Sequence, residues 1–133
     1  MLLTDEQKTK AVQYWSKFLK DPTAYMFNNG DDSTDGARTA MCAKLSRIHD
    51  FTQLDIEKFE RTLNDYLSRD VDEYKLKLDV DYRPTKLLDN VAELSLGKKY
   101  QPMNTFPCKT NMHFTTDGKV ILSEGYAAPD VVL

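Results

Sequence analysis

The chain has 133 residues, 41% of them hydrophobic, and its 18 Lys and Arg against 21 Asp and Glu give a formal net charge of -3. This length and composition predict one folded domain over residues 1–133, and the small acidic balance argues against binding to nucleic acid or to a membrane surface. No apolar run approaches the roughly 18 residues of a membrane span, and the first residues lack the pattern of a signal peptide. We therefore expect a soluble cytoplasmic protein, with Cys42 and Cys108 as thiols or, alternatively, as one bridge.

The first part of the chain carries several helix signals. A capping-box sequence begins at Thr4, and apolar residues with helical spacing follow it up to Lys20. A proline after an N-capping aspartate predicts a short second helix over residues 23–28. Residues 28–36 are rich in turn-forming residues and are expected to be a loop, after which a third helix is predicted over residues 37–48.

The next segment has the most regular pattern in the sequence. Phe51 and Ile56 can form a hydrophobic staple around Thr52, which predicts a fourth helix that runs to about Arg69. Over residues 74–82 every second residue is apolar, and the residues between them are charged. This alternation predicts a β-strand with one face on a core and the other face in water.

The remaining segments predict one more helix and a β-hairpin. Apolar residues share one helix face over residues 85–96, and Gly97 is well placed to end that helix. Further on, an Asp-Gly pair lies between two β-rich runs, residues 111–116 and 119–124, which is the strongest short-range signal of a hairpin. Met112, Phe114, Val120 and Leu122 are expected to line one face of that hairpin.

The order of these elements indicates an α+β fold. We expect an N-terminal four-helix half packed on a small three-stranded sheet, either mixed or antiparallel. The helix at residues 85–96 is long enough to be a right-handed crossover between parallel strands, so the mixed sheet is favoured.

No metal or cofactor site is indicated. Cys42 and His49 would share a helix face but lie about 10.5 Å apart along its axis, too far to bind one zinc ion together. Cys108 and His113 would point to opposite faces of a regular strand. Residues 31–36 resemble the opening of a calcium loop, but Cys42 stands where the bidentate glutamate should be. We therefore predict no metal ligands and no cofactor.

The first candidate for a binding surface is the proline-containing segment at residues 100–107. If it lies near polyproline II, the threefold repeat puts Tyr100, Met103 and Phe106 on one edge. Such an apolar edge is either a lid closed on the core or a contact surface for a partner. The lid is favoured because large apolar side chains are usually buried. The apolar residues 131–133 leave the same two alternatives.

These features favour a small protein-interaction domain, such as an adaptor, an inhibitor or an immunity-type protein, which binds a macromolecular partner that we expect to be a protein. The alternative is a small hydrolase or transferase with a site around His113 and Thr115. A histidine and a hydroxyl on one strand face can hold and protonate a phosphate oxygen. Asp79 or Asp81 would then be the first acid to consider.

Overall fold

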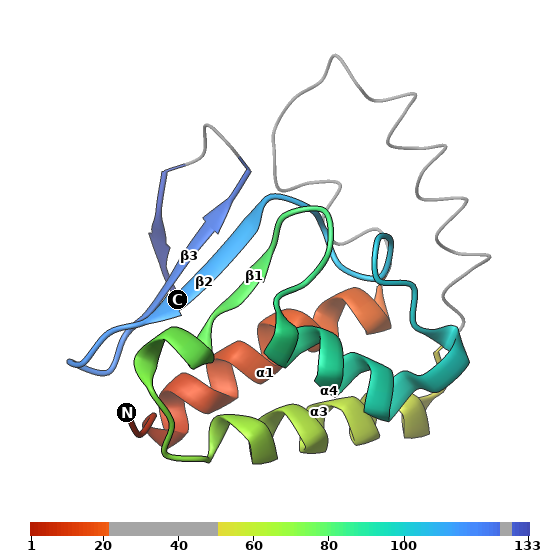
Figure 1. The fold of residues 1–133 in the computed structure, drawn as a ribbon, viewed down its shortest axis with the longest axis horizontal. Coiled ribbons are helices and arrows are strands. Elements are labelled where there is room, and N and C mark those ends of the chain that lie inside the picture. Colours follow the sequence, from red (N-terminus) through yellow and green to blue (C-terminus); the bar gives the residue numbers. More distant parts are fainter. Residues whose placement is uncertain (22–50, 126–128) are drawn as a thin grey trace.

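The computed structural model describes residues 1–21, 51–125 and 129–133 (Figure 1). The second and third predicted helices, the loop between them, Cys42 and His49 lie outside the described residues. The described helices are α1 (Asp5–Lys20), α3 (Gln53–Leu67) and α4 (Lys86–Leu96), with two 3₁₀ helices, η3 (Glu73–Leu76) and η4 (Gly97–Lys99). The strands are β1 (Leu78–Val80), β2 (Thr110–Phe114), β3 (Val120–Glu124) and β4 (Val131–Val132).

The sheet has four antiparallel strands in the order β1-β2-β3-β4. The α+β class is therefore confirmed, and the sheet is antiparallel, as in the second alternative. The favoured mixed sheet and the number of three strands are wrong. The chain after α4 returns to the end of β1, where the Lys109 amide donates to the Asp81 carbonyl at 3.0 Å. Because β2 starts where β1 ends, the two strands are antiparallel and α4 does not connect parallel strands. The C-terminal tail supplies the fourth strand.

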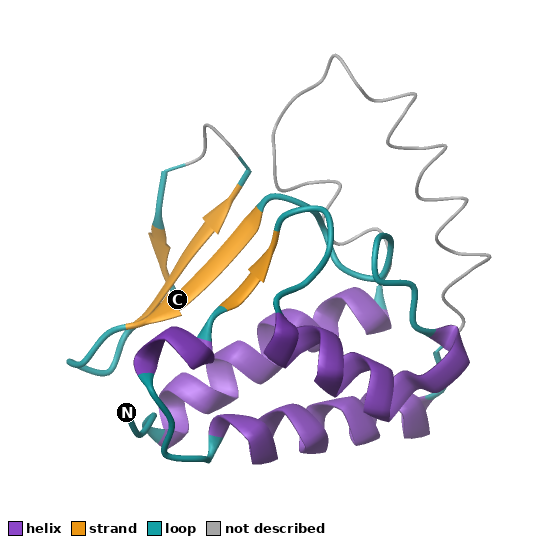
Figure 2. Ribbon diagram, in the orientation of Figure 1, coloured by secondary structure: helices purple, strands orange, loops and turns teal. Residues whose placement is uncertain are grey.

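The helices lie on one side of the sheet (Figure 2). α1 contacts β3 and α4 contacts β1, while α3 packs against both α1 and α4. In Figure 1 the helix α3 lies on the far side of α1 and α4 from the sheet. The core therefore has two layers, one between the sheet and the helices α1 and α4, and one between these two helices and α3. The inner face of the sheet contributes six buried apolar side chains, those of Leu78, Val80, Met112, Phe114, Val120 and Leu122.

The helix starts predicted at Thr4 and Thr52 are confirmed in atomic detail. Thr4 accepts a hydrogen bond from the Gln7 amide at 3.1 Å, and the Gln7 side chain accepts one from the Thr4 amide at 2.9 Å. Thr52 and Asp55 make the same reciprocal pair at the start of α3. These local bonds satisfy backbone donors that the first helical turn leaves without partners.

The predicted hairpin is confirmed as well. Met112 and Phe114 of β2 and Val120 and Leu122 of β3 are all buried, with Met112 opposite Leu122 and Phe114 opposite Val120. Gly118 lies in the turn with φ +88°, a backbone conformation that residues other than glycine rarely adopt.

The strand predicted over residues 74–82 is only partly correct. Regular pairing is confined to Leu78–Val80, because the preceding residues form η3 and the following residues turn toward α4. The Thr85 hydroxyl donates to the Lys77 carbonyl at 2.8 Å and accepts from the Asp79 amide at 3.2 Å, so the N-cap residue of α4 occupies the outer edge of β1. Tyr74 and Tyr82, at the two ends of the pattern, are 65% and 60% exposed.

Candidate functional site

The three residues predicted to share an apolar edge do not form one. Tyr100 and Phe106 are buried, with 8% and 2% exposure, whereas Met103 is 59% exposed. The chain turns between them, because the Gln101 carbonyl accepts hydrogen bonds from the amides of Asn104 and Thr105 at 2.9 and 2.8 Å. A turn replaces the extended polyproline II conformation, so the segment packs two of its three large side chains on the core.

Tyr100 also has a structural hydrogen bond. Its hydroxyl donates to the Asp89 carboxylate at 2.5 Å, and the other oxygen of Asp89 contacts Arg83 at 3.0 Å. Burial raises the pKa of the Tyr100 phenol well above its ordinary value, and the hydrogen bond to Asp89 raises it further. The phenol is therefore a fixed donor that fastens the segment to α4.

His113 and Thr115 occupy different settings. His113 is exposed on the outer face of β2, opposite Ile121. Thr115 lies beyond the end of β2, where its hydroxyl accepts from the Lys119 amide at 2.9 Å and donates to the Asp117 carboxylate. The Thr115 hydroxyl thus closes the hairpin turn.

The two acids considered beside His113 also differ. Asp79 lies on the outer sheet face, opposite Asn111, and burial raises the pKa of its carboxyl. A hydrogen bond from the Met112 amide and the charges of Lys77 and His113 oppose that shift in pKa. Asp81 instead forms an ion pair with Lys109. Of the two acids, therefore, Asp79 is the one that shares the sheet face of His113.

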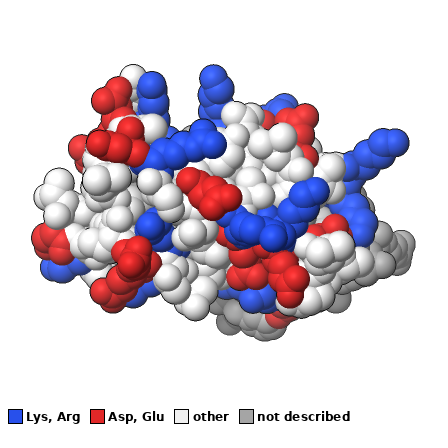
Figure 3. All heavy atoms as spheres, turned by 90° about the horizontal axis from the view of Figure 1, so that it is seen from below, with Lys and Arg blue, Asp and Glu red and all other residues white. Residues whose placement is uncertain are grey.

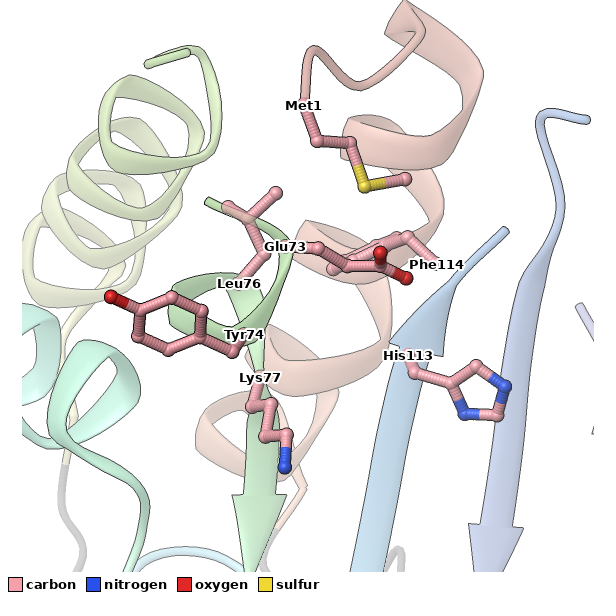
Figure 4. A pocket seen from close by; sticks show the side chains of 7 residues that line it. All are labelled: Met1, Glu73, Tyr74, Leu76, Lys77, His113 and Phe114. Carbon is pink, nitrogen blue, oxygen red and sulfur yellow. The ribbon is translucent and has the colours of Figure 1, made fainter. Parts of the chain in front are cut away.

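His113 borders a groove of about 370 Å³ beside η3, which we call the apolar groove. Its lining combines apolar side chains with one acid and one lysine: Met1, Glu73, Tyr74, Leu76, Lys77, His113 and Phe114. Figure 4 shows the imidazole of His113 directed away from the ammonium group of Lys77. The histidine thus forms the rim of a mainly apolar depression.

A second groove, of about 510 Å³, lies on the other side of η3, and we call it the basic groove. It is bounded by the end of α3, by η3 and by the start of α4, and it is lined by Tyr66, Arg69, Val71, Tyr74, Lys75, Lys77, Thr85, Lys86, Leu87 and Asn90. All four of its charged lining residues are cationic. These elements face the viewer in Figure 1. The groove is therefore a concave, positively charged site on the surface of a chain with a net negative charge.

The cations of the basic groove differ from most others in the described part of the chain. Seven lysines and arginines there form ion pairs with acids: Lys8, Lys10, Lys20, Arg83, Lys99, Lys109 and Lys119. Among the described residues, Arg69, Lys75, Lys77 and Lys86 have no such acidic partner. On the face shown in Figure 3, acidic and basic side chains are intermingled. The basic groove thus gathers four of the eight described lysines and arginines that form no ion pair, while the other four, Lys17, Lys58, Arg61 and Lys98, line neither groove.

Tyr74 and Lys77 line both grooves, so η3 forms the ridge between them. Sequence reasoning missed this site because Lys75 and Lys77 alternate with apolar and acidic residues, which suggested a solvated strand face. The turn of η3 changes the direction of these side chains and separates Glu73, in the apolar groove, from Lys75, in the basic groove. The break in the strand therefore creates the site.

The fold and the site define a small α+β protein with helices on one face of an antiparallel sheet and two adjoining grooves around η3. In the described part of the chain, no helix is both long and apolar enough to cross a membrane. The same residues contain no cluster of three or more His, Cys, Asp or Glu side chains placed to hold a metal ion. Comparisons of the chain with protein-family models, with curated proteins and with solved structures found no match.

Proposed function

We propose that this protein is an interaction domain of the adaptor, inhibitor or immunity type, which binds a protein partner through the two grooves around η3. The observation that carries the proposal is Tyr74, a large aromatic side chain that is 65% exposed on the ridge between the two concave surfaces. Tyrosine is enriched at the energetic centres of protein interfaces, because it offers a large contact area at a low entropic cost.

The chemistry of the surrounding surface supports this proposal. Leu76 and Phe114 line one groove, and Val71 and Leu87 line the other. Three lysines line the same surface, Lys77 in both grooves and Lys75 and Lys86 in the basic groove. An interface commonly combines an apolar centre with a polar rim, and long lysine side chains contribute both their apolar stems and their charges. A partner segment that crosses η3 would contact both kinds of surface with Tyr74 between them.

Site-specific photo-crosslinking tests the proposal. A photoreactive phenylalanine derivative placed at Tyr74 is expected to form covalent adducts with a defined protein in the native cells, and those adducts should disappear after protease treatment. The matched control is the same derivative at Leu54, which is 68% exposed on α3 and lines neither groove. The same set of adducts from both positions, or none from Tyr74, would refute the proposal.

A further inference from the structure

We propose that the basic groove binds a carboxylate-rich segment of the protein partner, with Arg69, Lys75, Lys77 and Lys86 as the recognition residues. This inference rests on the proposed function and adds the chemistry of the ligand. Its basis is the convergence of four cations on one concave surface that no acidic side chain lines.

The charge of the basic groove is complementary to an anionic ligand. Side chains of like charge repel one another when they are gathered at one site, and an anionic ligand relieves that repulsion. Glu73, an acidic residue of η3 itself, lines the apolar groove instead. The positive charge of the groove therefore favours an anionic ligand.

Helix α4 starts in the wall of the basic groove. Thr85 is the N-cap residue of α4, and both Thr85 and Lys86 line the groove. The N-terminal end of a helix carries a partial positive charge, which adds to the field of the four side chains. This contribution strengthens a site that the side chains already define.

The basic groove fits a short acidic peptide better than a nucleic acid. A single strand of nucleic acid needs an extended positive track with free aromatic faces for its bases. Two aromatic rings line the groove, and a cation already lies over one face of each: the Arg69 guanidinium is 4.2 Å from the centroid of Tyr66, and the Lys75 ammonium is 5.8 Å from that of Tyr74. A short acidic segment needs only the groove itself, together with its apolar walls at Val71 and Leu87.

The test is an NMR titration of the ¹⁵N-labelled full chain with hexaglutamate at low ionic strength. Saturable shifts are expected for amides around residues 66–77 and 85–90, and hexaglutamine should produce none. Added salt should weaken the binding, because it screens charges at a protein surface. The double charge reversal Lys75→Glu with Lys86→Glu should raise the dissociation constant at least about tenfold.

The matched control is Lys58→Glu with Lys98→Glu, which removes the same charge from two exposed lysines that line neither groove. It should leave the dissociation constant within about twofold of the original, apart from the small long-range effect of net charge. Three results would overturn the inference: equal weakening of hexaglutamate binding by the two double variants, no shifts with hexaglutamate, or tighter binding of inorganic phosphate or a single-stranded oligonucleotide.

The photo-crosslink at Tyr74 separates this inference from the proposed function. If one of these three results is obtained and Tyr74 still crosslinks to a protein, only the proposed ligand chemistry is wrong. If the crosslink at Tyr74 is absent as well, both proposals are refuted.

Discussion

Replacing Phe106 by alanine is expected to lower the free energy of unfolding by about 3 to 5 kcal/mol, the cost of emptying a large aromatic site in a core. The Phe106 ring is 2% exposed, and its centroid lies 5.5 Å from that of Trp15 and 5.7 Å from that of Phe59. It therefore joins α1 and α3 to the segment that follows η4. Urea denaturation followed by circular dichroism measures the loss, and Phe106→Leu provides a milder variant if the alanine variant does not fold.

Met103 supplies the matched control from the same segment. Because its side chain is 59% exposed, Met103→Ala should change the free energy of unfolding by no more than about 0.5 kcal/mol. Equal losses at Met103 and Phe106 would contradict the assignment of Phe106 to the core. A large loss at Phe106 alone would establish that this segment holds the fold together.

The second large effect is expected at Gln7, which connects α1 to the hairpin. Its side-chain amide donates to the carbonyl oxygens of Thr115 and Lys119 at 2.9 and 3.0 Å, and the residue is 1% exposed. Gln7→Glu keeps an acceptor for the Thr4 amide but places a carboxylate against two carbonyl oxygens. The free energy of unfolding at pH 7 should fall by about 3 kcal/mol, because two hydrogen bonds are lost and a buried carboxylate faces two carbonyl oxygens. Each carbonyl oxygen keeps one backbone donor, the Gly118 amide for Thr115 and the Thr115 amide for Lys119.

The effect at Gln7 should also depend on pH. Burial beside two carbonyl oxygens raises the pKa of the introduced carboxyl in the folded state, so the folded chain binds a proton more readily than the unfolded chain. The loss of stability is then fully present above that raised pKa and shrinks as the pH falls toward the ordinary value of a glutamate. Thermal unfolding of both chains between pH 4 and 8 would measure this, with the exposed residue Gln13 and its variant Gln13→Glu as the control. A loss of stability that does not vary with pH would contradict the assigned hydrogen bonds.

Local signals in the sequence predicted most of the described secondary structure. The capping box at Thr4, the N-cap at Thr52 with its hydrophobic staple, and the Asp-Gly turn act over a few residues, so neighbouring residues alone determine them. The burial of Met112 and Leu122 follows from strand alternation in the same way. These elements needed no knowledge of the tertiary structure.

The errors arose where tertiary contacts decide the conformation. The pattern over residues 74–82 is regular, yet Thr85 bonds to the edge of β1 and η3 replaces the first part of the strand. The turn at Gln101 likewise separates Met103 from the two aromatic residues around it. In each case hydrogen bonds that the hydrophobic pattern does not reveal override the extended conformation that the pattern favours.

The basic groove was not predictable from the sequence, because its four cations come from three separate elements. Arg69 follows α3, Lys75 and Lys77 belong to the segment around η3, and Lys86 begins α4. In the sequence each lies near acids, so no basic cluster is visible. Only the fold directs them to one surface, and the pairing of the neighbouring Asp89 with Arg83 and Tyr100 leaves the groove without an acid.

We expect above all that a protein partner places carboxylates in the basic groove. Carbodiimide coupling tests it most directly, because this reagent joins an amine to a carboxylate only when the two groups are in contact. Applied to the partner complex and followed by mass spectrometry, it should link Lys75, Lys77 or Lys86 to aspartate or glutamate residues of the partner. Intermolecular links confined to lysines elsewhere, such as Lys58 and Lys98, would contradict the claim.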